Sequence, residues 1–240
     1  MRAGLRQQWK RSVGAAVHAR THRWRTGGDN NAPQGCLPWR IARRTTRVCR
    51  DVRLWLVGEP SRKRATYEDV LRAPPHMIAE VVAGDLHLQP RPCFRHARAA
   101  SRLGVLLGPA DMDEGVGGWI ILDEPELHLQ DDILVPDLAG WRRETMPELP
   151  DEPFTTLRPD WLCEVLSRST EQRDRSDKLP VYAREGVQHI WFVDPEIQTL
   201  EVLRLDGDTY RIITTERGSG TCRLEPFEEI ELSLAKLWSR

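Results

Sequence analysis

Apolar positions recur at regular intervals from residue 66 onward, and their spacing predicts a series of short strands and helices. Strands are expected at residues 77–82, 85–89, 119–122, 126–129, 133–135, 161–166, 189–193, 199–205 and 209–214. Helices are expected at residues 66–73, 94–107, 169–185 and 233–238. This order predicts a mixed α/β domain with a single sheet and helices on its faces.

Capping and helix-breaking residues set the boundaries of the two longer helices. Ser169 and Gln172 have the spacing of a capping box, which places the start of the third helix there. Pro180 lies inside that helix and predicts a kink, because proline lacks the N–H that an internal helical turn needs. Gly108 and Pro109 are expected to end the second helix.

Glu164 is the one charged residue in the strongly apolar strand at residues 161–166. A strand period of two puts Glu164 on one face, between Leu162 and Leu166, while the other face is wholly apolar. Apolar residues on both faces predict a strand that is covered on both sides. A lone carboxylate at such a position is costly unless a cation, a metal ion or a hydrogen-bond donor compensates it. The sequence therefore predicts a partner for Glu164.

Three further polar residues lie in or beside the predicted elements. Glu80 lies within a strand, Asp137 follows one, and Lys178 lies on the helix after Glu164. Carboxylates that converge on one place repel each other unless a divalent metal ion neutralises them. Oxygen ligands without a Cys/His cluster suit Mg²⁺ or Mn²⁺ rather than Zn²⁺. Such an ion activates water and neutralises phosphoryl charge, and a nearby Lys stabilises the transition state, so the set suits phosphodiester hydrolysis.

Each residue of this set also has an ordinary structural explanation. Asp137 follows a proline, where Asp is a common turn residue. Glu80 alone suggests a solvated strand residue, and Lys178 alone suggests a surface residue paired with Asp174. Glu164 could be compensated by a structural Arg. The four residues together, in this order along the chain, favour the metal site over these alternatives.

A run of motifs then extends over residues 135–194. They are Val135-Pro136-Asp137-Leu138, Pro159-Asp160-Trp161-Leu162-Cys163-Glu164-Val165-Leu166-Ser167, Ser169-Thr170, Asp174, Lys178-Leu179-Pro180, Tyr182, Gly186-Val187 and Ile190-Trp191-Phe192-Val193-Asp194. Together they resemble the Uma-type restriction endonuclease family, which belongs to the PD-(D/E)xK nuclease superfamily. The likeness covers about residues 65–238 and is most specific over residues 159–194.

The resemblance implies a restriction endonuclease-like fold, in which helices flank a mixed sheet. It also implies a catalytic set and its metal ligands: Glu80, Asp137, Glu164 and Lys178 as catalytic residues, with Glu80, Asp137, Glu164 and the backbone carbonyl of Val165 holding Mg²⁺ or Mn²⁺. The superfamily pattern puts the lysine two residues after the second acid, where this chain has Leu166. Lys178 would therefore have to reach back from the following helix.

Charge divides the chain into two segments. Residues 1–64 contain 16 Lys and Arg against three acids. Residues 65–240 contain 19 Lys and Arg against 33 acids, a net charge of −14. We expect residues 1–64 to be a disordered extension, or to precede a true translation start near Val57. Residues 65–240 are expected to form the restriction endonuclease-like domain.

Cysteine usage and hydropathy bear on where the protein works. The five Cys residues are scattered and include no C-x-x-C pair, so neither a disulfide framework nor a zinc site is indicated. This favours a reducing, cytoplasmic setting. No apolar run is long enough to span a bilayer, so no membrane partner is expected.

The sequence leaves more than one function open. The first is a Mg²⁺-dependent endonuclease acting on DNA, although the acidity of residues 65–240 opposes binding to a polyanion. Arginines near the site could form a local basic rim: Arg91, Arg95, Arg98, Arg102, Arg168, Arg173 and Arg175. The second is a nuclease-fold binding or scaffold module with little or no turnover, and the third is a phosphodiesterase for RNA or a nucleotide. By analogy with the superfamily, a homodimer is expected.

Overall fold

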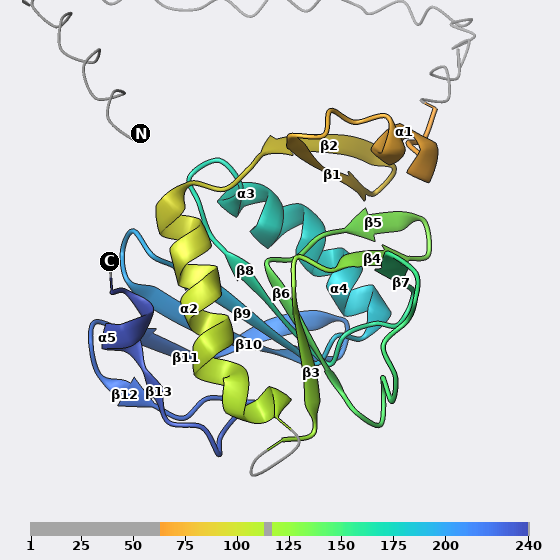
Figure 1. Ribbon diagram of the computed structural model, residues 1–240. Coiled ribbons are helices and arrows are strands. Elements are labelled where there is room, and N and C mark those ends of the chain that lie inside the picture. The colour runs from red at the N-terminus through yellow and green to blue at the C-terminus, as the bar shows by residue number, and fades with distance from the viewer. Residues whose placement is uncertain (1–62, 113–116, 240) are drawn as a thin grey trace, which may run out of the picture. The chain divides into compact units, whose positions relative to one another are not determined.

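The main sheet is built around β8, the strand that carries Glu164. Six strands hydrogen-bond in the order β11–β10–β9–β8–β6–β3 (Figure 1). Their bounds are β3 (Trp119–Asp123), β6 (Leu138–Arg142), β8 (Trp161–Val165), β9 (His189–Asp194), β10 (Thr199–Asp206) and β11 (Thr209–Arg217). β8 and β9 run parallel, and the other neighbouring pairs are antiparallel.

The computed structural model describes residues 63–112 and 117–239. Residues 1–62, which make up nearly all of the basic extension, lie outside the described residues. Its predicted disorder, and the alternative start near Val57, therefore stay predictions. Within the described ranges, no helix combines the length and the apolar character needed to cross a membrane.

A second sheet lies beside the first and has the order β2–β1–β5–β4–β7. Its strands are β1 (Met77–Val82), β2 (Asp85–Pro90), β4 (Glu126–Leu129), β5 (Asp132–Leu134) and β7 (Phe154–Thr155). A third pair joins β12 (Thr221–Cys222) to β13 (Leu232–Ser233). The mixed α/β class is confirmed, but the expected single sheet is wrong. Glu124, between β3 and β4, has a positive φ of 47°, and this sharp turn directs β4 out of the main sheet.

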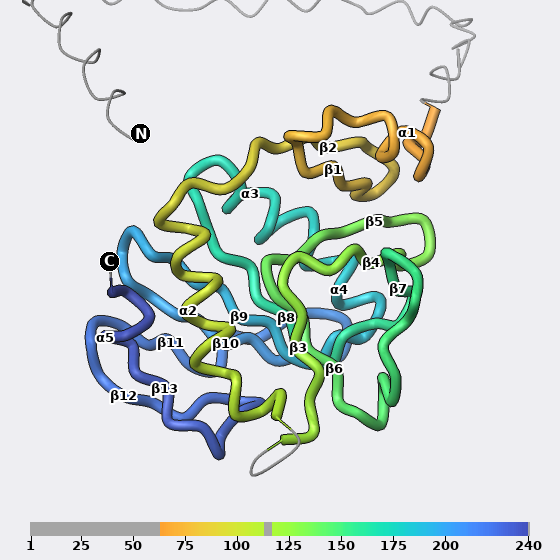
Figure 2. Tube along the Cα trace, viewed as in Figure 1, coloured from red at the N-terminus to blue at the C-terminus, as the bar shows by residue number. Residues whose placement is uncertain are grey.

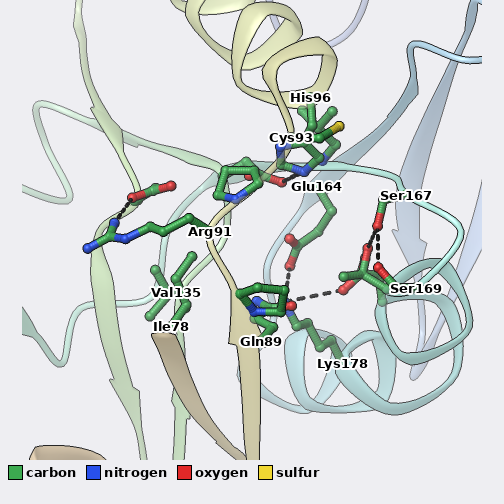
Figure 3. Close-up of a pocket in the computed structure, with 17 residues that line it drawn as sticks. Ile78, Gln89, Arg91, Cys93, His96, Val135, Glu164, Ser167, Ser169 and Lys178 are labelled. Atoms are coloured by element: carbon green, nitrogen blue, oxygen red, sulfur yellow. Dashed lines mark hydrogen bonds and ion pairs between the residues drawn. The ribbon is translucent and has the colours of Figure 1, made fainter. Parts of the chain in front are cut away.

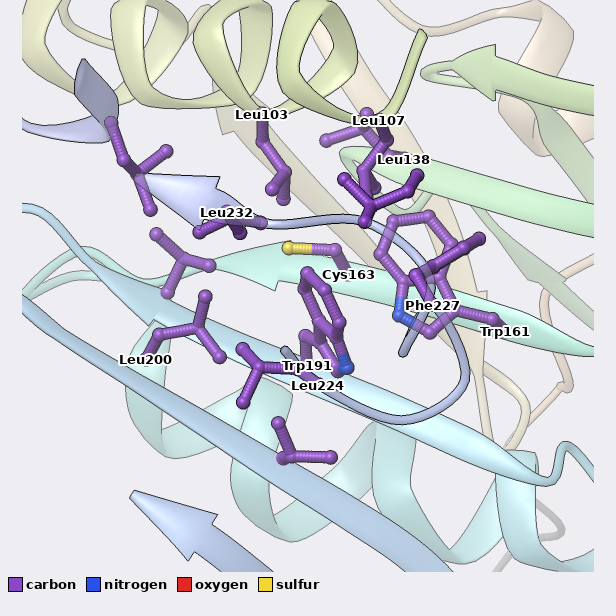
Figure 4. Close-up of a cluster of buried hydrophobic side chains, with 14 of the residues drawn as sticks. Leu103, Leu107, Leu138, Trp161, Cys163, Trp191, Leu200, Leu224, Phe227 and Leu232 are labelled. Carbon is purple, nitrogen blue, oxygen red and sulfur yellow. The ribbon is translucent and has the colours of Figure 1, made fainter. Parts of the chain in front are cut away.

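Helices cover both faces of the six-stranded sheet. They are α2 (Phe94–Asp111), α3 (Glu171–Arg173), the π-helical segment η1 (Asp174–Lys178), α4 (Leu179–Glu185) and α5 (Leu234–Leu237), whereas α1 (Tyr67–Leu71) lies beside β1 of the second sheet. On one face, Leu103 and Leu107 of α2 share an apolar cluster with Cys163 of β8 (Figure 4). On the other face, Val181 of α4 shares a cluster with Leu162 of β8. All five residues of β8 are buried, so the predicted strand covered on both sides is confirmed.

Two predicted helix features differ from the structure. α2 continues through Gly108 and Pro109 to Asp111, and the expected stop at Gly108 is wrong. Pro109 leaves the carbonyl of Val105 without its helical donor, but Val105 is exposed, so water can satisfy that carbonyl. The capping box at Ser169 is also wrong, because the helix begins after Thr170 and shows no side-chain cap.

The helix is irregular near Pro180, as expected, because the π-helical segment η1 ends at Lys178, two residues before this proline. Pro180 has no N–H to offer the preceding turn, and a wider turn is a common way for a helix to accommodate this. α3, η1 and α4 follow one another along the same course behind β8, which the trace shows as a continuous coil (Figure 2). The helix ends at Gly186 in the left-handed region, with a φ of 78°, as its position predicts.

The sequence pattern misses β6, although it lies between β8 and β3 in the main sheet. Gly140 interrupts its apolar pattern and, by sequence alone, weakens the case for a strand. In the structure Gly140 pairs with Trp161 of β8, and a Cβ atom at Gly140 would lie 3.1 Å from Cε3 of that indole. The missing side chain therefore makes room for the large ring on the neighbouring strand.

Gly140→Val is expected to lower the free energy of unfolding by about 1–3 kcal/mol, because the added methyl groups overpack the site beside Trp161. Urea unfolding followed by tryptophan fluorescence measures the change. Gly220→Val is the matched control, since a Cβ at Gly220 meets no atom within 4 Å. Equal stability of the two variants would show that Gly140 is not there to accommodate Trp161.

Candidate functional site

The partner that Glu164 needs comes from the helix that follows β8. Glu164 is 3% exposed, and its Oε1 lies 3.1 Å from the Nζ atom of Lys178. The hydroxyl of Tyr182 donates a hydrogen bond of 2.7 Å to the same oxygen. A cation and a neutral donor thus compensate this carboxylate, and Lys178 does reach back to Glu164 from the helix (Figure 3).

Helical spacing explains why one segment supplies both groups. Asp174, Lys178 and Tyr182 are four residues apart, which places them on one stripe of the helix facing β8. All three are buried, although η1 replaces regular α-helix between Asp174 and Lys178. Lys178 is only 1% exposed, and its Nζ also lies 3.3 Å from Oδ1 of Asp174. Asp174 and Tyr182 therefore belong to the site, although the sequence analysis did not place them among the catalytic residues.

Glu80 reaches the same ammonium from the second sheet. Its Oε1 lies 2.9 Å from Nζ of Lys178 and accepts a 3.0 Å hydrogen bond from the backbone N–H of Val135. Its Oε2 accepts a hydrogen bond of 3.2 Å from Nε2 of Gln89. Glu80 is fully buried and both of its oxygens are engaged, so its geometry suits the placement of Lys178 better than the binding of a metal ion.

Asp137 lies between β5 and β6 and is held by two groups. Its Oδ2 accepts a 2.7 Å hydrogen bond from the backbone N–H of Val165, and Nε2 of His96 lies 3.3 Å from the same oxygen. The Asp137 side chain is 15% exposed, so it can be reached from solvent. Asp137, Glu164 and Val165 line one cavity of about 260 Å³, together with Lys178 (Figure 3).

His96 is a site residue that the sequence analysis set aside as an ordinary histidine. It lies on α2, and its Nδ1 is buried without a hydrogen-bond partner among the described residues. Burial lowers the pKa of His96, but its hydrogen bond to Asp137 and the charge of that residue outweigh burial and raise the pKa overall. No sequence pattern connects α2 to the turn at Asp137, so only the packing of α2 on the sheet could identify this contact.

Negative charge exceeds positive charge around Lys178. Burial raises the pKa of Glu164 well above its usual range, and Lys178 opposes this while the carboxylates of Asp174, Asp137 and Glu80 reinforce it. Burial likewise raises the pKa of Asp174. For Lys178, burial favours the neutral amine, but the surrounding carboxylates prevail and raise its pKa well above the usual value. The Lys178 ammonium and the guanidinium of Arg173, whose Nη2 lies 4.0 Å from Oε2 of Glu80, thus face three carboxylates, and the remaining negative charge calls for a proton or a further cation.

The donor chemistry on the cavity side fits a hard divalent cation. Asp137 Oδ1 and Glu164 Oε2 have no hydrogen-bond partner within residues 63–112 and 117–239, and Val165 lines the same cavity. Over those same residues, no group of three or more His, Cys, Asp or Glu side chains is arranged to hold a metal ion. Two carboxylates and a carbonyl nevertheless match the habit of Mg²⁺, which keeps several of its waters.

Comparisons with known proteins agree with this architecture. A crystal structure described as that of a "putative nuclease belonging to DUF820" from Anabaena variabilis superposes with a TM-score of 0.59 at 20% sequence identity. The match covers 72% of this chain and 97% of that chain, and it shows a shared fold. No curated protein sequence matches the chain significantly. The family model Uma2, described as "Putative restriction endonuclease", matches residues 64–235, and the protein therefore belongs to the Uma2 family.

Proposed function

We propose that the protein is a Mg²⁺-dependent endonuclease that hydrolyses phosphodiester bonds in DNA. The observation that carries the proposal is the single cavity in which Asp137, Glu164 and Lys178 meet. Two acids and an ammonium from three separate parts of the chain converge there, and each is held in place by other groups. Membership of the Uma2 family supports the same reaction class.

Asp137, Glu164 and the carbonyl of Val165 would hold Mg²⁺ or Mn²⁺. When bound, such an ion supplies a water nucleophile and neutralises charge on the phosphoryl oxygens. The hydrogen bond from Val165 N–H and the contact with His96 hold Oδ2 of Asp137 in place, so this side chain would need little further ordering to bind an ion.

Lys178 supplies a fixed positive charge at the cavity wall. Its three carboxylate neighbours keep it protonated and occupy its N–H groups, so it would stabilise the developing phosphoryl anion through its charge. Glu80 and Asp174 act as positioning residues, because they hold the ammonium and do not themselves need to touch the substrate. The relocation of the lysine from a strand to the following helix therefore leaves it within reach of Glu164.

The net negative charge of the domain opposes the binding of DNA. Residues 65–240 carry a net charge of −14, so affinity for a polyanion has to come from local basic groups. Arg91 lies at the cavity, where its Nη1 is 3.6 Å from Oε2 of Glu124, and the side chain of Arg168, which follows the cavity residue Ser167, is 86% exposed. Arg95 and Arg98 are also exposed at this end of α2. The divalent ion itself would offset further phosphate charge.

Asp137→Asn and Glu164→Gln are each expected to reduce Mg²⁺-dependent cleavage by at least about 100-fold, because both substitutions remove a ligand charge while keeping the shape of the side chain. Plasmid, single-stranded DNA and RNA serve as substrates, with Mg²⁺, Mn²⁺ or EDTA present. Gel electrophoresis measures the rate of cutting and separates DNA cleavage from RNA cleavage.

Asp160→Asn is the matched control for this experiment. Asp160 also follows a proline, but its Oδ2 accepts a hydrogen bond from Arg142 N at the start of β8, away from the cavity, and cleavage should persist. Cutting that survives both Asp137→Asn and Glu164→Gln would disprove the site. Absence of cutting by the wild type on every substrate would favour a nuclease-fold module that binds without turnover.

The stability difference between Glu164→Gln and wild type is expected to depend on pH. Because the folded pKa of Glu164 is raised, the proton it holds stabilises the folded state at acidic pH, and this contribution is lost as pH rises above the ordinary value of 4.5. Gln at this position does not titrate. In EDTA, the Tm of Glu164→Gln should therefore rise relative to that of wild type between about pH 5 and about pH 8.

Mg²⁺ should reduce the difference in Tm between Glu164→Gln and wild type at the higher pH. A bound ion replaces the proton as the compensating charge, so it should raise the Tm of wild type more than that of Glu164→Gln. Thermal unfolding followed by circular dichroism gives both values. Parallel pH curves for the two proteins, with no selective effect of Mg²⁺, would contradict the expected coupling between Glu164, protons and metal.

A further inference from the structure

Phe94 is the most exposed large apolar side chain among the described residues, with 96% of its surface open to solvent. Single exposed apolar residues are common and need no explanation on their own. Phe94, however, opens α2 directly beside Cys93 and close to His96, which both line the cavity of Asp137 and Glu164. Its position, rather than its exposure alone, sets it apart.

The first turns of α2 separate two cavities. Cys93 and His96 line the cavity that holds the carboxylates, whereas Phe94, Arg95 and Arg98 line a second cavity of about 510 Å³. Residues three and four apart are neighbours on a helix surface, so Phe94, Arg95 and Arg98 form one face. We call these three side chains the α2 ridge. A polymer chain that passes over the start of α2 from one cavity to the other would contact it.

Charge on the second cavity favours a polyanion. Arg95 and Arg98 are exposed and have no carboxylate within 4 Å in the part of the chain that the structure describes. Among the residues that the structure describes, the one acid that lines this cavity is Glu196, which is paired with the exposed Arg168. Arg168 connects the two cavities from the other side, since its neighbours Ser167 and Ser169 line the first cavity. Among the described residues, the two arginines that line the second cavity, together with Arg168 as the partner of Glu196, thus outnumber its one acid.

Binding sites for single-stranded nucleic acids commonly combine exposed aromatic rings with nearby arginines. Bases stack on exposed aromatic faces, and arginines contact the adjoining phosphates. Trp238 also lines this cavity and donates its Nε1–H to the carbonyl of Gly218, which fixes its ring. The second cavity therefore has two aromatic side chains and a basic rim next to the proposed scissile position.

We propose that Phe94 stacks on an unpaired base next to the phosphate that is cut, while Arg95 and Arg98 contact the flanking backbone. This inference rests on the proposed nuclease function and adds the form of its substrate, a single-stranded or locally opened segment of nucleic acid. The α2 ridge then supplies the local positive charge that the acidic domain otherwise lacks.

Binding is measured by fluorescence anisotropy with a labelled single-stranded DNA oligonucleotide and a labelled blunt duplex of the same sequence. The full chain is used with Ca²⁺ in place of Mg²⁺, so that binding is observed without turnover. Phe94→Ala is expected to weaken single-strand binding at least about fivefold, the lower end of the strength of base stacking on an aromatic side chain. Phe94→Trp should retain the affinity, and the duplex should be affected less than the single strand.

Val105→Ala is the matched control, because Val105 is also a largely exposed apolar residue of α2 but lines neither cavity. Its affinity should equal that of wild type. The double substitution Arg95→Ala with Arg98→Ala should reduce the slope of log affinity against log salt by about 0.7 for each phosphate that the protein no longer neutralises. Urea unfolding midpoints equal to that of wild type would confirm that these surface changes leave the fold intact.

The outcomes separate this inference from the proposed function. Wild-type cleavage together with unchanged single-strand affinity of Phe94→Ala would overturn the role of the ridge and leave the nuclease proposal standing. Absence of both cleavage and binding in the wild type would overturn both. If Phe94→Ala instead changes the mass of the particle in light scattering, with DNA affinity intact, the ridge is a contact between copies of the chain and the stacking role is wrong.

Discussion

The buried ion pair between Glu164 and Lys178 is the constraint around which the rest of the site is arranged. Both groups are almost completely removed from water, where an uncompensated charge would cost several kcal/mol. Neither can therefore move away from the other without a large loss of stability. The pair fixes the helix from Glu171 to Glu185 against β8, and it places the ammonium at the wall of the cavity.

The same ammonium also ties the two larger sheets together. Glu80 comes from β1 of the second sheet, whereas Glu164 comes from β8 of the main sheet, and both contact Nζ of Lys178. A third carboxylate, Asp174, comes from the helix itself. Lys178, and Arg173 beside Glu80, supply two positive charges against three acids, so the arrangement remains short of positive charge. A site that is rigid but short of positive charge is well suited to take up a divalent cation together with a substrate phosphate.

Asp137 differs from the other acids in two ways. Its side chain is partly exposed to solvent, and it lies in the segment between β5 and β6. It is held from behind by the backbone of β8 and by His96 on α2, so α2 on one face of the main sheet and the α3–α4 helix on the other both contribute to the cavity. The candidate site residues thus converge because β8 is common to both helical layers. α2 contributes to two features. Its His96 contacts Asp137 at the cavity, and its α2 ridge lies on the surface outside the cavity.

Local sequence determined much of this protein. The period-two pattern of residues 161–166 was sufficient to predict a covered strand with a compensated acid, and the two Gly-containing turns were sufficient to predict the hairpins β1–β2 and β10–β11. The spacing of four from Asp174 to Lys178 also depends only on helical geometry. These features rest on contacts between residues close in the chain, and side-chain periodicity reports such contacts directly.

Only the tertiary structure decided the rest. The strand β6 follows no alternating pattern because Gly140 leaves space for Trp161 across the sheet, and that space exists only once the strands have paired. His96 contacts Asp137 because segments far apart in the sequence pack together. Both oxygens of Glu80 accept hydrogen bonds, and the bond from Val135 likewise comes from a distant segment. The sequence could indicate that Glu164 needs a partner, since burial is encoded locally. Which cation reaches it depends on how the helix and both sheets pack in three dimensions, and local periodicity carries no record of that packing.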